Sequence, residues 1–385
     1  MGTYNVMDAK AAARATIDQV GERLVALSHR IHEHPELKWE EEQSSAWTAG
    51  ALSDAGLPVD MGICDLPTAF SCVVGDGPLH IAICAEYDAL PGIGHACGHN
   101  IIASSAVGAG LALAPLADDL GITLHVIGTP AEEGGGGKVY LLERGAFDGV
   151  HAAMMVHPAP QEDIYVRVSA VAHLHVSYSG RSAHAAFAPH HGVNALDAFT
   201  IAQVAMGLLR QHLRPGDQLH SIITHGGDAV NVVPEHTEGF LMARATTLDE
   251  LENLRPRVMN CLEAGALATG ARLAVENVAP DYAQMEHDHD IAELYRANAK
   301  ELGRPPSNDR VGTFSTDMGN ISLAMPSIHP CIAIETDGAV NHQPEFAAAA
   351  VNASADRAVL EGALGMAWTV IDVATGPQRE RLLSR

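Results

Sequence analysis

The chain has 385 residues, a hydrophobic content of 47% and a formal net charge of −24 at pH 7. This length is sufficient for two domains with apolar cores, and the negative charge disfavours nucleic acids and anionic membranes as partners. No apolar run approaches the ~20 residues of a transmembrane helix, and the N-terminus lacks the features of a secretory signal. The six cysteines contain no CxxC pair and do not resemble a secreted disulfide framework. We therefore expect a cytoplasmic protein with no membrane and no nucleic-acid partner.

The first 160 residues alternate between predicted helices and predicted strands. Residues 11–34 carry one apolar stripe at helical spacing, formed by Ile17, Val20, Leu24, Leu27 and Ile31. Continuous apolar runs predict buried strands at 79–85, 122–130 and 149–158, and predicted helices lie between them at 101–116 and 138–147. Continuous apolar strands that alternate with helices are typical of an α/β layer with a mostly parallel sheet.

The pattern changes after Pro160. Predicted strands and helices now follow in the order β-α-β-β-α-β, at 170–180, 194–213, 219–227, 237–247, 248–268 and 271–279. We expect Pro256 to kink or split the second of these helices. This order defines a ferredoxin-like unit. From about Ile291 the alternation of helices and strands seen in the first 160 residues returns. The sequence therefore predicts an α/β catalytic domain of residues 1–169 and 285–385, with an inserted ferredoxin-like domain of residues 170–284.

Side chains that can bind a metal follow the ends of four predicted strands. Ligands in parallel α/β sheets bind just beyond the carboxyl ends of strands, so these side chains are expected to converge. Each has an ordinary explanation when taken alone, such as a buried small hydrophobe, a helix N-terminus or a core histidine. Their joint placement predicts a metal site. The side chains are Asp88, Cys97 and His99 in "GHACGHN", Glu132 and Glu133 in "AEEGGGG", His157, and His342 in "NHQPEF".

The chemistry of these residue types is consistent with a hydrolytic metal centre. Thiolate, imidazole and carboxylate together suit a borderline divalent ion such as Zn²⁺ or Mn²⁺. Two ions ~3.5–4 Å apart can activate a water for attack on a carbonyl. One carboxylate must then stay outside the ligand set as general base, and the adjacent Glu132 and Glu133 offer that division. The glycine run at 134–137 has no side chains to block a substrate.

Motifs along nearly the whole chain resemble one family. It is the metallopeptidase family of aminoacylases, glutamate carboxypeptidases and indoleacetyl-amino-acid hydrolases, and the nearest branch resembles the B component of aminobenzoyl-glutamate hydrolase and the aminoacylase-like dipeptidases. The motifs are "HEHPELKWEE", "AEYDALPGIGHACGHN", "GTPAEEGGGGK", "MMVHP", "GRSAHAAFAPHHGVNALDA", "GGDAVNVVPE", "STDMGNIS" and "NHQPEF".

The resemblance implies a role for each matching residue. Glu132 matches the general base, which takes a proton from the bridging water and returns it to the leaving amine. Asp88 matches a second carboxylate that orients a metal ligand and tunes its basicity. The positions that match the ligands of two metal ions are Cys97, His99, Glu133, His157 and His342.

The resemblance also makes the inserted domain a lid or a homodimerisation domain. His184 and Asn231 match positions that approach the scissile carbonyl, His184 either in its own chain or across a dimer. The alternatives are a surface residue at a helix start for His184 and a turn residue for Asn231. Arg244 either binds a substrate carboxylate or forms a surface ion pair. Asp317 and Gly319 match a loop at the pocket wall, and His329 either reaches or supports the pocket.

Three functions are compatible with the sequence. The first is a metal-dependent amidohydrolase that acts on a small-molecule amide, either an N-acyl or N-aroyl amino acid or a dipeptide-like substrate. The second is a metal-dependent hydrolytic deaminase of an aromatic amine, which would use the same site. The third is a catalytically silent homologue that binds small molecules. Asn100 stands where much of the wider amidohydrolase group has Asp, so the substrate preference of the indoleacetyl hydrolases does not transfer directly.

Overall fold

The computed structural model describes residues 5–307 and 312–385, and the chain divides into two compact units. Unit 1 contains the chain up to Arg167 and again from Met285, and unit 2 is Val168–Gln284. Each unit has its own buried apolar clusters. The chain therefore leaves the first unit, completes a second and returns.

Unit 1 is built on a six-stranded sheet of order β1-β2-β4-β3-β5-β11. Strands β4, β3, β5 and β11 pair in parallel, whereas β1 and β2 form an antiparallel edge. A short parallel pair, β12 with β6, forms a separate sheet. This arrangement confirms the predicted α/β fold with a mostly parallel sheet. The strands are β1 (Val59–Met61), β2 (Phe70–Val74), β3 (Leu79–Ala85), β4 (Ile122–Gly128), β5 (Ala152–Met154), β6 (His157–Ala159), β11 (Ser327–Ile328) and β12 (Cys331–Ala333).

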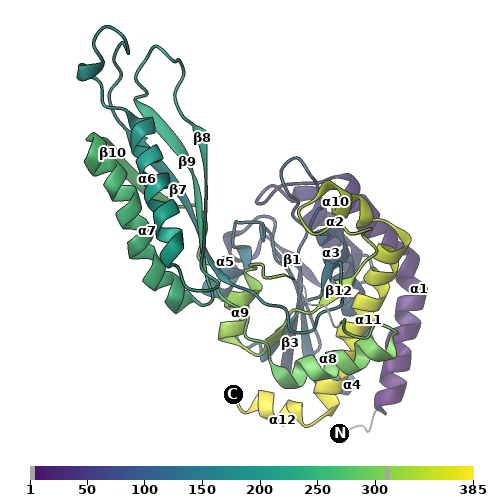
Figure 1. The fold of residues 1–385 in the computed structure, drawn as a ribbon. Coiled ribbons are helices and arrows are strands. Elements are labelled where there is room, and N and C mark those ends of the chain that lie inside the picture. The colour runs from purple at the N-terminus through teal and green to yellow at the C-terminus, as the bar shows by residue number, and fades with distance from the viewer. Residues whose placement is uncertain (1–4, 308–311) are drawn as a thin grey trace. The chain divides into compact units, whose positions relative to one another are not determined.

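The packing of the central strand β3 explains why all of its residues except His80 are apolar. Ile81 and Ile83 point into the cluster that contains α1, α3 and α11, whereas Ala82 and Cys84 point into the cluster that contains α5 and α9. Both faces of the strand are therefore covered by helices, and no position can be polar without a buried partner. Figure 1 shows α1 beside α11 at one flank of this unit. The helices are α1 (Val6–Glu33), α2 (Glu42–Ser53), α3 (His99–Leu113), α4 (Ala117–Leu120), α5 (Gly137–Glu143), α8 (His289–Glu301), α9 (Met318–Ala324), α10 (Pro344–Ala349), α11 (Ala353–Thr375) and α12 (Gln378–Leu383).

Two helical segments are long and apolar enough to cross a membrane by composition alone. Within residues 5–307 and 312–385 they are His99–Leu120, whose apolar window of 18 residues is 89% buried, and Ala353–Thr375, whose corresponding window is 78% buried. Their apolar surface is occupied by the core of unit 1, because α3 and α11 pack against each other and against α1. Core packing therefore accounts for their hydropathy.

Unit 2 has the element order β7-α6-β8-β9-α7-β10 and an antiparallel sheet of order β10-β7-β9-β8. Alternate residues of its strands pack on α6 and α7, which lie side by side (Figure 1). Helix α7 continues through Pro256 without a break, so the predicted split is wrong. The flanking Leu254 and Val258 are buried, and this packing offsets the lost backbone hydrogen bond. The elements are β7 (Ala170–Ser179), α6 (Ala195–Leu209), β8 (Gln218–His225), β9 (His236–Ala245), α7 (Leu248–Thr269) and β10 (Arg272–Asn277).

Candidate metal centre

The loop between β3 and α3 carries the first two candidate ligands, Cys97 and His99. Gly98 separates them and adopts a left-handed backbone conformation with φ of +71°. A Cβ atom at this position would lie 2.5 Å from Cγ of Pro158, so only glycine fits. The tight turn therefore places both side chains on one side of the loop, and His99 begins α3.

Cys97, His99 and His157 form the first candidate ligand group. One ligand atom from each lies within 4.8 Å of the others. The two imidazole rings are perpendicular, with centroids 5.8 Å apart. His157 opens β6, immediately after the apolar strand β5, so it lies where the strand-end argument expects it.

Cys97, Glu133 and His342 form a second group of the same size. Nε2 of His342 lies 3.7 Å from Oε1 of Glu133. The backbone of His342 has a φ of +71°, and its N–H donates to the carbonyl of Ala96 at 3.0 Å. Cys97 belongs to both groups, so its sulfur lies where two neighbouring ions would share a ligand.

Hydrogen bonds to Nδ1 determine which imidazole nitrogen of His99 and His157 is left for a metal. Nδ1 of His99 donates to the Asp88 carboxylate at 3.0 Å, and Nδ1 of His157 donates to the Pro158 carbonyl at 2.8 Å. The other oxygen of Asp88 accepts from the backbone N–H of Glu133 at 2.9 Å. Both histidines are therefore held with Nε2 available for a metal, and Asp88 links two ligands.

The residues present fit a divalent metal. Among residues 5–307 and 312–385, Nε2 of His99 and Oε1 of Glu133 are buried atoms without a hydrogen-bond partner. Burial alone would lower the pKa of His99, but Asp88, Glu86 and Glu133 raise it to about 10. A site that attracts positive charge so strongly, and that offers thiolate, imidazole and carboxylate donors, suits ions such as Zn²⁺ and Mn²⁺.

Glu132 lies beside the ligands: it belongs to neither group that contains Cys97, but it forms a third group with Glu86 and His99 whose ligand atoms also lie within 4.8 Å of one another. Its Oε2 is 3.9 Å from Nε2 of His99, and the residue is 7% exposed. Burial, with the charges of Glu86 and Glu133, raises the pKa of Glu132 well above its usual range. The side chain is therefore close to the ligand atoms in a setting that favours proton uptake.

A buried ion-pair network lies next to the ligands and was not predicted from the sequence. Nζ of Lys138 is 2.5 Å from Oε1 of Glu86 and 2.8 Å from Oδ1 of Asp317, and all three side chains are fully buried. The other oxygen of Glu86 is 3.5 Å from Nε2 of His99. Asp317, predicted at a pocket wall, is thus bound to Lys138. The one feature of the sequence that could have indicated this network is Lys138, which is one of four lysines in the chain and lies between a glycine run and an apolar stretch.

The glycine run at 134–137 has a conformational role in the loop. Gly134 and Gly136 have φ of +73° and +75°. Cβ atoms at Gly135 and Gly137 would lie 2.6 Å from the Ala131 Cβ and 1.8 Å from the Pro130 carbonyl oxygen. The run therefore coils tightly on the residues that precede Glu132.

The remaining predicted residues are His184, Asn231 and Arg244 in unit 2, and His329 in unit 1. His184 and Asn231 are exposed residues of unit 2, joined locally because the N–H of Ala185 donates to the Asn231 carbonyl. Arg244 belongs to β9 of the same unit. His329 is buried in unit 1 beside His157, with ring centroids 5.4 Å apart.

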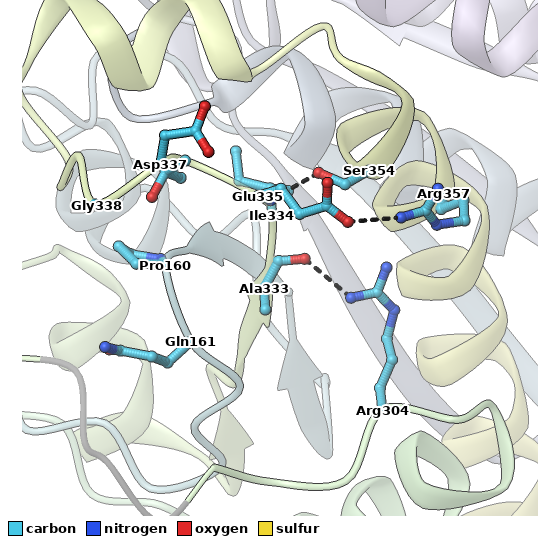
Figure 2. Close-up of a pocket in the computed structure, with 11 residues that line it drawn as sticks. Pro160, Gln161, Arg304, Ala333, Ile334, Glu335, Asp337, Gly338, Ser354 and Arg357 are labelled. Atoms are coloured by element: carbon cyan, nitrogen blue, oxygen red, sulfur yellow. Dashed lines mark hydrogen bonds and ion pairs between the residues drawn. The ribbon is translucent and has the colours of Figure 1, made fainter.

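A cavity of about 480 Å³ in unit 1 is distinct from the ligand cluster (Figure 2). It is lined by the segments that follow β6 and β12, together with Arg304 and Arg357. Two of its charged side chains are paired, because Arg357 contacts Glu335 at 3.2 Å and Arg304 contacts Glu162 at 2.7 Å. None of the predicted site residues lines it.

An α/β unit that gathers cysteine, histidine and carboxylate side chains at the ends of its strands is typical of a metal-dependent hydrolase. The chain belongs to peptidase family M20/M25/M40, whose model matches residues 82–359. It is 36% identical to a mouse Xaa-Arg dipeptidase over 386 residues, which is 96% of this chain and 89% of the mouse protein. It is also 33% identical to the B component of the p-aminobenzoyl-glutamate hydrolase of Escherichia coli, over 64% of this chain and 56% of that protein.

Solved structures share the fold. An aminobenzoyl-glutamate utilization protein from Klebsiella pneumoniae covers 95% of this chain and 99% of its own length, with a TM-score of 0.76 and 18% identity. A dinuclear metal-binding M20 peptidase from Bacillus subtilis covers 92% of this chain and 99% of its own, with a TM-score of 0.68 and 20% identity. The chain is thus a metal-dependent amidohydrolase, as the resemblance implied.

Proposed function

We propose that the protein hydrolyses the linear amide bond of an N-acyl or N-aroyl amino acid, or of a dipeptide-like substrate, with Glu132 as general base. The observation that carries this proposal is the pair of ligand groups that share Cys97, with the Glu132 carboxylate beside them. The mouse and E. coli relatives, named as a dipeptidase and an aminobenzoyl-glutamate hydrolase, support the substrate class.

Two divalent ions, Zn²⁺ or Mn²⁺, are the proposed cofactors. Cys97, His99 and His157 would hold one, and Cys97, Glu133 and His342 the other. The charge of the site supports this number. Glu86, Asp88, Glu132, Glu133 and Asp317 are carboxylates of low exposure in this region, and Lys138 is the buried lysine paired with two of them. So much buried negative charge requires compensation by cations.

When bound, such ions polarise a carbonyl group and lower the pKa of water. The residues of the chain supply the rest. Asp88 holds the His99 ring and the Glu133 backbone in place. Glu132 takes the proton from the attacking water and returns it to the nitrogen of the departing amine. Because Glu132 is buried, its carboxylate exchanges protons with the reactants in preference to bulk water.

Unit 2 is proposed as a ferredoxin-like lid that also forms a homodimer. Nδ1 of His184 accepts the N–H groups of Ala186 and Phe187 at 3.2 and 3.1 Å, so the ring proton is placed on Nε2. Such a ring can donate a hydrogen bond to a developing oxyanion, together with Asn231. Strand β8 is the outer strand of its sheet and carries Ile222, which is 61% exposed, so a second copy is a suitable partner for this edge.

The test of the proposed chemistry is Glu132→Gln. We expect this variant to keep its metal and lose turnover, because the amide cannot take up the proton. Elemental analysis and hydrolysis of a panel of N-acyl amino acids and dipeptides, read by mass spectrometry, measure the two properties. Glu143→Gln, an exposed residue of α5, is the matched control. Wild-type turnover in Glu132→Gln would refute the role of this carboxylate.

The proposed dimer is tested by light scattering of the wild type and of Ile222→Asp. We expect the wild type to be a dimer and the variant to dissociate, because the new charge would be buried at the interface. Mixing Glu132→Gln with His184→Ala protein tests the trans role of His184. Restored activity in the mixture supports action across the dimer, and no restoration places His184 in its own chain.

A further inference from the structure

Ala131, the residue before Glu132, has an unusual backbone conformation. Its φ is +57°, in the left-handed region that residues with a Cβ atom rarely adopt. The residue is fully buried, and its carbonyl accepts the N–H groups of Gly135 and Gly136 at 3.1 and 2.9 Å. Such strain persists only where surrounding contacts enforce it, and it is concentrated at functional sites.

The contact that enforces this conformation comes from Glu41, ninety residues earlier in the chain. Oε1 of Glu41 accepts the N–H of Ala131 at 2.7 Å. Oε2 accepts the hydroxyl of Thr68 at 3.1 Å, and the carbonyl of Thr68 in turn accepts the hydroxyl of Tyr87. Glu41 and Thr68 are 0% and 4% exposed. Both carboxylate oxygens are therefore fixed.

Glu41 serves no local purpose that would explain a buried acid. It directly precedes α2, but its side chain makes no capping hydrogen bond to that helix. Glu36 does so instead, because its carboxylate accepts the N–H groups of Gln43 and Ser44 at 3.0 and 2.7 Å. Burial and the nearby charge of Asp88 raise the pKa of Glu41 to about 7, so this carboxyl group is costly to bury.

The same N-terminal segment contacts the loop a second time. Nζ of Lys38 donates to the carbonyl of Gly134 at 2.7 Å. Residues 38–41 thus contact the loop on both sides of Glu132 and Glu133. A loop held at both ends cannot rotate its central peptide freely, and that peptide sets the direction of the Glu132 side chain.

We propose that Glu41 is a positioning residue, whose carboxylate holds the N–H of Ala131 in the left-handed conformation and thereby fixes the direction of Glu132. The proposal rests on the proposed role of Glu132 as general base. A misplaced base slows proton transfer without weakening substrate binding, so the expected effect is on kcat rather than on KM.

Reach and charge can be separated at this position. Glu41→Gln keeps an acceptor oxygen at the right distance and loses the charge, and its amide can still pair with the Thr68 hydroxyl. Glu41→Asp keeps the charge but is one carbon–carbon bond too short to reach Ala131. We expect Glu41→Gln to retain most of its kcat and Glu41→Asp to lose kcat by about 10²-fold, with KM and metal content unchanged. Glu40→Asp, the exposed neighbour, is the matched control and is expected to behave as the wild type.

A double-mutant cycle with Ala131→Gly tests the backbone argument. Glycine adopts positive φ readily, so it needs less support from Glu41. The kcat loss caused by Glu41→Asp should therefore be smaller in the Ala131→Gly background than in the wild type. Equal losses in the two backgrounds would overturn the proposal, as would wild-type kcat in Glu41→Asp or a Glu41→Gln variant as impaired as Glu41→Asp.

Two further measurements keep the test decisive. If Glu41→Asp does not fold, Thr68→Val takes its place, because loss of the hydroxyl that holds Oε2 lets the carboxylate turn away from the N–H of Ala131. A lowered kcat at unchanged KM supports the proposal and a wild-type kcat overturns it. Glu132→Gln is measured in parallel: if it is active, the proposed function fails whatever Glu41 does. If Glu132→Gln is inactive and Glu41→Asp is fully active, only the positioning role fails.

Discussion

Replacement of Lys138 by methionine tests the buried network beside the ligands. The change removes the ammonium group that neutralises Glu86 and Asp317, at 2.5 and 2.8 Å, and leaves two uncompensated carboxylates with no exposure to water. Breaking a buried ion pair by removing one partner costs about 3–5 kcal/mol. For a domain of this size class, one kcal/mol shifts Tm by roughly 2–4 °C, so we expect a decrease of about 6–20 °C.

The assay is thermal unfolding of the metal-free protein, followed by circular dichroism in the presence of a chelator. Lys300→Met, an exposed lysine on α8, is the control and should unfold as the wild type does. The double variant Lys138→Met/Asp317→Asn should recover part of the loss, because it leaves one uncompensated carboxylate, that of Glu86, instead of two. Added divalent metal should also reduce the difference, since cations replace part of the missing charge. A single variant as stable as the wild type without metal would refute this reasoning.

Metal stoichiometry and acid stability give two more tests. First, Cys97→Ala should release both ions, because Cys97 belongs to both ligand groups, whereas His157→Ala and His342→Ala should each release one; elemental analysis measures the stoichiometry, and an unchanged metal content in Cys97→Ala would contradict the shared ligand. Second, burial and the neighbouring His80 lower the pKa of His125 to about 4, below its unfolded value of about 6.5. The unfolded state therefore binds the proton first, and stability is lost as pH falls through this window. His125→Gln should lose less stability than the wild type between about pH 6.5 and pH 4, measured by urea unfolding; equal losses would show that His125 does not contribute.

Most of the fold of unit 1 could be predicted from the sequence, because the strands of a parallel sheet have a recognisable sequence pattern. Strands such as β3 and β4 are buried on both faces, so they appear as mostly apolar runs without a regular alternation of polar residues. Consecutive parallel strands bring their carboxyl ends to one edge, so the side chains that follow them converge even though they lie far apart in the chain. That rule groups Cys97, Glu133 and His157 from the order of strands, and the family motifs separate Glu132, as the base, from the ligands.

Only the tertiary structure revealed the residues that hold this site in place. Lys138 and Glu41 carry no periodicity and lie outside the strand-end pattern. Their meaning depends on partners far away in the chain: Asp317 is 179 residues from Lys138, and Ala131 is 90 residues from Glu41. From the sequence alone, a charged side chain is predicted to lie on the surface, because its burial and its partner are not known. The candidate ligands could be predicted from the order of the strands. The residues that contact them from behind depend on packing between segments far apart in the chain, and the sequence of one such segment does not indicate the other.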